Sequence, residues 1–136
     1  MGKILAIDWG EKRVGYAISD ETQTVAFPRG IWQGSPQKSL FRTIGQFLKE
    51  ENISLILIGA ALSSDNEETI QSQKSRAFGE KLFKKFNIPV ISVDEFGTSD
   101  EALSKIPSRA DRIKKTGNTD TIAAQIILQR YLDSPR

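Results

Sequence analysis

Three short apolar runs constrain this chain more than any other feature of its sequence. Residues 3–8, 53–59 and 89–93 are rich in Ile, Leu and Val, and each is shorter than a typical buried helix. The first and third runs lead directly into acidic residues, Asp8 and the pair Asp94-Glu95. Strands buried on both faces of a sheet have this composition, so the runs predict a central sheet covered by helices.

The segments between these runs predict the rest of the architecture. Residues 13–19 and 22–32 are expected to form two further strands, which give an antiparallel meander with the first strand. Pro28 indicates that the third strand is an edge strand or a broken one. The predicted order is β-β-β-α-β-α-β-α-α, an α/β fold in which helices flank both sides of a mixed sheet, in a single domain over residues 1–136. Helices are expected over 35–48, 66–86, 98–104 and 119–132, the last with Ile122, Ala123, Ile126, Ile127 and Tyr131 on its buried side.

The composition excludes several kinds of chemistry. Among 136 residues there is no Cys and no His, so disulfides, thiolate or imidazole metal sites and His-based triads are all excluded. Catalysis would have to use carboxylates, Lys, hydroxyls or a hard metal ion bound by oxygen. No apolar stretch approaches the roughly 18 residues of a membrane span. We therefore expect a cytoplasmic protein that does not associate with membranes.

Four acidic residues stand where chemistry is plausible. Asp8 ends an apolar strand, where a charge is costly unless it faces a cleft or a cation. Asp94 and Glu95 end another such strand, and Asp120 lies in the first turn of the last helix. Taken singly, each acid is more typical of a turn or a helix start than of a catalytic site. Taken together they favour a shared site beyond the strand ends, and carboxylates without His suit Mg²⁺ or Mn²⁺.

A basic segment follows the last of the predicted strands. Between residues 105 and 115 the chain has five basic residues and one acid, while its formal net charge is only +2. Such a segment indicates a contact with a polyanion, and a solvated loop is an equally good interpretation. The same two interpretations hold for Lys12 and Arg13 beside Asp8. The basic residues of the segment are Lys105, Arg109, Arg112, Lys114 and Lys115.

Three motifs resemble the signatures of the YqgF/RuvX family. They are Ile7-Asp8-Trp9-Gly10-Glu11-Lys12-Arg13-Val14-Gly15, then Val93-Asp94-Glu95 with Thr98-Ser99-Asp100-Glu101-Ala102, and the helix that begins at Asp120-Thr121-Ile122-Ala123. They occur in the family's order and extend the resemblance over nearly the whole chain. The resemblance implies an RNase H-like fold and an active site of Asp8, Glu95 and Asp120 that holds Mg²⁺ or Mn²⁺. Asp94 is the alternative middle ligand, because adjacent strand residues point to opposite faces.

The resemblance also implies a function. It indicates a nuclease that acts on structured nucleic acid, either precursor RNA of the small ribosomal subunit in ribosomal precursor particles or branched DNA, as a monomer or a homodimer. Phe96 stands where the family usually has Arg, so a nucleic-acid-binding or ribosome-associated protein with weak or no catalysis is the alternative. Trp9 and Phe96 either pack internally or stack on a base. The expected phosphate contacts are Lys12, Arg13, Arg109, Arg112, Lys114 and Lys115.

Overall fold

The computed structural model describes residues 2–10, 13–34, 37–60, 70–94 and 119–135 of the chain. Five sequence predictions concern residues outside these ranges: the start of the first helix at 35, the start of the second helix at 66, the helix over 98–104, the basic segment and the contacts of Phe96. The predicted strands and the remaining parts of the predicted helices can be compared with the structure.

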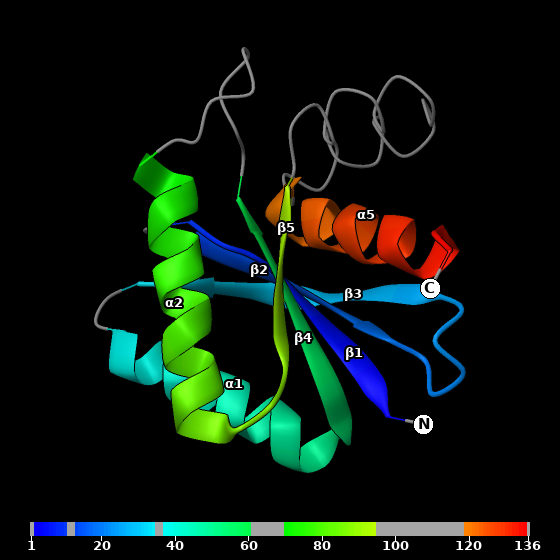
Figure 1. Ribbon diagram of the computed structural model, residues 1–136, viewed down its shortest axis with the longest axis horizontal. Helices are drawn as coiled ribbons and strands as arrows, with labels where there is room; N and C mark the ends of the chain where they lie inside the picture. Colours follow the sequence, from blue (N-terminus) through cyan, green and yellow to red (C-terminus); the bar gives the residue numbers. More distant parts are fainter. Residues whose placement is uncertain (1, 11–12, 35–36, 61–69, 95–118, 136) are drawn as a thin grey trace.

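A single five-stranded sheet forms the centre of the molecule (Figure 1). Its strand order is β3-β2-β1-β4-β5, with antiparallel pairing between β1, β2 and β3 and parallel pairing of β1 with β4 and of β4 with β5. The predicted meander is confirmed. Pro28 lies in the edge strand next to a register irregularity, where a missing backbone donor is tolerated. The strands are β1 (Lys3–Asp8), β2 (Arg13–Ser19), β3 (Ala26–Gln33), β4 (Ile53–Ala60) and β5 (Val90–Asp94).

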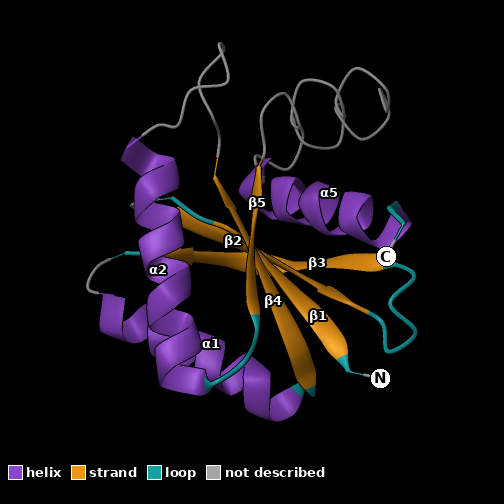
Figure 2. Ribbon diagram, viewed as in Figure 1, coloured by secondary structure: helices purple, strands orange, loops and turns teal. Residues whose placement is uncertain are grey.

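Helices cover both faces of the sheet (Figure 2). They are α1 (Gln37–Glu50), α2 (Ile70–Phe86) and α5 (Thr119–Asp133). Side chains alternate between the faces of a strand, so β1 serves two cores: Leu5 and Ile7 pack with α1 and α2, whereas Ile4 and Ala6 pack with α5. Each fully buried Ile or Leu contributes about 1.5–3 kcal/mol to stability. None of the described helices is long and apolar enough to cross a membrane.

Two sequence predictions about burial are wrong in part. The last helix buries Ile126 and Ile127 as expected, but Ile122, Ala123 and Tyr131 are only half-buried. The helix is apolar on most sides, so its periodicity alone does not select the face that meets the sheet. The run at 89–93 was expected to be buried on both faces, yet β5 is an edge strand and Ile91 is 41% exposed. The residues of α5 in the sheet-facing core are Ala124, Leu128 and Leu132.

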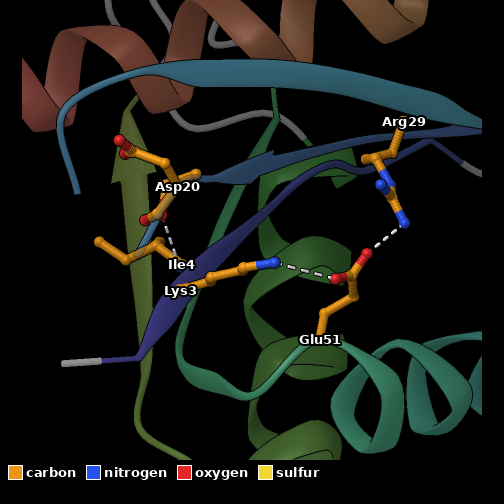
Figure 3. Close-up of polar contacts among 6 residues, drawn as sticks. Lys3, Ile4, Asp20, Arg29 and Glu51 are labelled. Carbon is orange, nitrogen blue, oxygen red and sulfur yellow. Dashed lines mark hydrogen bonds and ion pairs between the residues drawn. The ribbon is translucent and has the colours of Figure 1, made fainter. Parts of the chain in front are cut away.

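One carboxylate joins three elements at the amino end of the sheet. Glu51, between α1 and β4, accepts a hydrogen bond from Lys3 Nζ at 3.1 Å and one from the guanidinium of Arg29 (Figure 3). The hydrogen bond from Lys3 and the two positive charges hold the pKa of Glu51 below its ordinary value. The Arg29 guanidinium also lies 5.9 Å from the centre of the Phe47 ring. This group therefore links β1, β3 and α1.

The turn between β2 and β3 is organised by Asp20. Its carboxylate accepts hydrogen bonds from Thr22 Oγ1 at 2.6 Å, Thr24 N at 2.8 Å and Val25 N at 3.1 Å. These bonds, the one from Thr22 foremost, lower the pKa of Asp20 from its ordinary 3.8 to about 2.

We expect Asp20→Ala to weaken the fold and to flatten its acid dependence. A carboxylate whose pKa is lower in the folded state stabilises that state above its ordinary pKa, and the stabilisation is lost as the pH falls through the folded value. The window is therefore pH 4 to pH 2. Denaturant titrations across this window measure the effect, with Glu21→Ala in the same turn as control. An acid dependence identical to that of the parent would contradict the assignment.

A buried tyrosine gives a second prediction. Tyr16 is 2% exposed and packs edge-on against Phe47, and its hydroxyl has no hydrogen-bond partner among the described residues. Burial accordingly raises the pKa of Tyr16. We expect Tyr16→Phe to be neutral or to stabilise the fold by up to about 1 kcal/mol, because it removes a desolvated polar group and keeps the ring. A marked decrease in the urea concentration at the midpoint of unfolding would instead show that the Tyr16 hydroxyl has a hydrogen-bond partner.

Candidate active site

The carboxyl ends of three parallel strands meet at one edge of the sheet. Asp8 at the end of β1 pairs with Gly59 of β4, and Ala60 pairs with Asp94 at the end of β5. The two acidic positions thus lie at the same edge, separated by one strand. Functional groups of open α/β sheets gather at such an edge.

Asp8 is flanked by glycine on both sides. In the sheet register its neighbours are Gly15 on β2 and Gly59 on β4, so neither adjacent strand places a side chain beside it. By alternation from Ile4 and Ala6, Asp8 projects toward the face of the sheet that α5 covers. Asp8 is half-buried, and its neighbours in the two adjacent strands contribute only backbone beside it.

The chain turns sharply after Asp8. Trp9 N donates to the carbonyl oxygen of Gly59 at 2.9 Å, and a Cβ at Gly10 would lie only 2.6 Å from the carbonyl oxygen of Arg13. Only glycine fits such a close approach. The turn places the exposed Arg13 at the edge that Asp8 occupies. Trp9 itself is 6% exposed with its ring 6.4 Å from that of Phe78, so it packs in the core and is not a surface for base stacking.

The first turn of α5 contains a second acidic position, Asp120, one helical turn before Ala124. Ala124 shares a core with Ala6, which is two residues before Asp8 on the same strand face. The helix begins at the end of the molecule where β4 and β5 finish (Figure 1). The backbone of this first turn is therefore at the same end of the sheet as Asp8.

Two glutamines fix this position of α5. Gln129 accepts a hydrogen bond from Ala26 N at 2.9 Å and donates one to the carbonyl oxygen of Thr24 at 3.1 Å. Gln125 donates to the carbonyl oxygen of Ala26 at 3.1 Å. The helix therefore continues the hydrogen bonding of the edge strand β3 with side-chain amides. Sequence reasoning missed both residues, because a polar residue on a helix gives no sign of the backbone that it contacts.

The structure describes part of the predicted site. Asp8 and Arg13 are described in full, and Asp94 and Asp120 through their backbone. No group of three acidic residues able to hold a metal ion occurs among the described residues, and the predicted set needs Glu95, which is not one of them. The other predicted residues outside the described ranges are Lys12, Arg109, Arg112, Lys114 and Lys115.

Comparison with solved structures defines the class of this fold. It is an α/β fold of the RNase H-like type, shared with Holliday junction resolvases. A RuvC from T. thermophilus, solved in complex with a Holliday junction substrate, superposes with a TM-score of 0.61 at 15% identity over 96% of this chain and 93% of that one. The fowlpox virus Holliday junction resolvase superposes with a TM-score of 0.55 at 20% identity, over 96% and 97% of the two chains.

Sequence comparison gives the family. The RuvX family, described as "Holliday junction resolvase", matches residues 2–134, and the chain belongs to it. A relative from Maridesulfovibrio salexigens is 36% identical over 132 residues, which are 96% of this chain and 97% of the relative. One from Dictyoglomus turgidum is 36% identical over 136 residues, with 97% and 94% covered. Both bear the name "Putative pre-16S rRNA nuclease". Nucleases and resolvases are hydrolases that cleave phosphodiester bonds.

Gln129→Leu tests how α5 is held. The substitution removes the side-chain amide and leaves Ala26 N and the Thr24 carbonyl without this partner, which we expect to cost about 1–3 kcal/mol. The free energy of unfolding from urea titration measures this loss. Gln46→Leu on α1, whose amide donates to Glu50 on the same exposed helix face, is the control and should change stability little. Equal effects of the two substitutions would contradict the role given to Gln129.

Proposed function

We propose that this protein is an endonuclease that depends on divalent metal ions and cleaves structured nucleic acid in the cytoplasm. Its substrate class is precursor RNA of the small ribosomal subunit, which the names of its relatives suggest, or branched DNA, on which the structurally similar resolvases act. The observation that supports the proposal is the placement of Asp8 between two glycines at the carboxyl ends of the parallel strands, on the sheet face that α5 covers.

The proposed metal ligands are Asp8, Glu95 and Asp120. Glu95 is preferred to Asp94 because Val93 belongs to the core on the α5 side, and strand residues two apart share a face. A donor set made only of carboxylate oxygens, in a chain without His or Cys, fits Mg²⁺ or Mn²⁺. Such ions, when bound, activate water and stabilise the leaving oxygen of a phosphodiester.

The remaining residues of the proposed site hold the substrate. Arg13 is exposed at the edge of Asp8, where its guanidinium can pair with a phosphate. Lys12 and the basic residues Arg109, Arg112, Lys114 and Lys115 are proposed as further phosphate contacts. The glycines beside Asp8 let the scissile phosphate approach the carboxylate without steric obstruction from the neighbouring strands.

A catalytically weak nucleic-acid-binding protein is the second candidate. The observation that favours it is Phe96, which occupies the position where the family usually has Arg. An aromatic ring there does not orient a phosphate, so turnover would be slow although the carboxylates are retained. Phe96→Arg should then increase cleavage without changing the affinity for metal ions.

Asp8→Asn tests the proposed function. The substitution preserves the shape of the side chain but removes one anionic ligand of the proposed metal site. We therefore expect Mg²⁺- or Mn²⁺-dependent cleavage of ribosomal RNA precursor or of a branched DNA to fall by at least about a hundredfold. Losses of this order are typical when one group that stabilises the transition state electrostatically is removed. Calorimetric titration with Mn²⁺ should show weaker binding. Asp133→Asn, at the exposed far end of α5, is the matched control and should cleave normally. Full cleavage by Asp8→Asn would refute the assignment of the site.

A further inference from the structure

The helices α1 and α2 form a strongly basic layer on the face of the sheet opposite α5. Together they contain eight basic and two acidic residues, a formal charge of +6 in a chain whose total is only +2. All eight basic side chains are exposed. Within the described part of the chain, these two helices therefore give one face of the sheet a large positive charge.

Six of these basic residues form two rows. Lys38, Arg42 and Lys49 are four and seven residues apart along α1, which puts them on one stripe of a helix with 3.6 residues per turn. Lys74, Lys81 and Lys85 are seven and four residues apart along α2 and likewise share one stripe.

The two rows border a groove between the helices. Its volume is about 650 Å³, and Arg42 and Lys49 of the first row and Lys85 of the second are among its lining residues. The floor includes Phe41 and Phe86, and none of the described residues that line the groove is acidic. The Lys85 ammonium lies 5.7 Å from the centre of the Phe41 ring and 6.0 Å from that of Phe86, so this cation is held at the groove.

A glycine in the middle of α1 shapes the groove. Gly45 costs about 1 kcal/mol relative to Ala in a helix interior. A Cβ at this position would lie 3.2 Å from the ring of Phe86, so glycine lets the ring lie directly against α1. The close contact between the C-terminal turn of α2 and α1 therefore brings Lys85 to the groove that Arg42 and Lys49 line.

We infer that this groove and its two rows of cations bind the phosphodiester backbone of nucleic acid, as a second contact distant from the candidate active site. The inference rests on the proposed function, because it assigns this face to the same substrate. The groove lies at the amino end of the sheet, where α1 and α2 end, whereas Asp8 lies at the carboxyl edge. The row on α2 extends between these two ends over a helix about 25 Å long.

The charge pattern favours nucleic acid over other occupants. A second copy of the chain would bring the same positive groove against itself, which is unfavourable. An acidic peptide would match the charge of the residues at the groove itself. The two rows of cations, however, continue beyond the groove to Lys38 and Lys74. Such an extended row of charges suits a polymer that has a negative charge on every unit, as nucleic acid does. Phe41 and Phe86 also pack into the core, so recognition depends on phosphates and is insensitive to sequence.

The test compares two double substitutions that change the net charge equally. Arg42→Glu/Lys49→Glu reverses two cations that line the groove, and Lys84→Glu/Arg130→Glu reverses two exposed cations that do not. Both are made in the Asp8→Asn background. Binding of a fluorescein-labelled single-stranded RNA is followed by anisotropy over a series of salt concentrations, with EDTA present so that no cleavage occurs.

We expect the groove variant to bind this RNA at least tenfold more weakly at physiological salt. The slope of log affinity against log salt should fall by about 1.4, because each lost phosphate contact on a single strand contributes about 0.7. The control pair should stay within threefold of the parent. Thermal unfolding verifies that both variants fold, and Arg42→Gln/Lys49→Gln replaces the groove variant if it does not, with a smaller loss in the same direction.

Three results would overturn the inference. The first is RNA binding by the groove variant that equals that of the parent, and the second is an equal loss of RNA binding in the control pair. The third is that the groove variant loses binding to a labelled oligoglutamate peptide while its binding to the RNA is unchanged. The first result would show that the groove does not bind nucleic acid. The second would show that RNA binding depends on the net charge of the protein and not on the groove. The third would assign the groove to an acidic protein. Cleavage by Asp8→Asn is a separate measurement, so the proposed function and this inference can fail independently.

Discussion

The burial of β1 on both faces is the constraint on which the rest of the structure depends. Ile4, Leu5, Ala6 and Ile7 are fully buried, and alternation sends successive side chains into two different cores. This arrangement requires α1 and α2 on one face and α5 on the other. It also fixes where the strand must end, because Asp8 is the first residue whose charge cannot enter either core. The position of the candidate active site thus follows from the packing of the central strand.

Local pattern was sufficient to predict most elements and the pairing of the strands, but not how α5 and β5 are buried. The apolar runs, Pro28 and the helical periodicity correctly predicted the meander, the parallel strands and the position of the last helix. They did not reveal which side of α5 meets the sheet, because that choice depends on Gln125 and Gln129 reaching the backbone of Thr24 and Ala26 about a hundred residues earlier in the chain. They also predicted that β5 is a buried strand, whereas it is an edge strand. The prediction failed because Val and Ile are common in both kinds of strand.

The candidate site was predictable to a similar degree. Asp8 was found because a charge at the end of an apolar strand needs an explanation, and its placement at the carboxyl edge agrees with that reasoning. The pairing of Gly15 and Gly59 around it was not predictable, since it joins two strands that are 44 positions apart in the sequence. For the same reason the sequence drew attention to the contiguous basic segment at 105–115, while the cations of α1 and α2 are grouped only by the contact between two helices.

A nuclease site built from carboxylates repels its own substrate, since three acids and a phosphodiester all carry negative charge. Metal ions remove this repulsion only at the cleaved bond, so the affinity for the rest of the nucleic acid must come from positive charge elsewhere. In this chain Lys3 and Arg29 are engaged by Glu51 at the amino end of the sheet, whereas no described acidic residue is among those that line the groove between α1 and α2. The proposed enzyme requires such a separation of acids at one edge from cations on one face: on this proposal the cations would hold a long polyanion while its scissile phosphate enters the acidic edge.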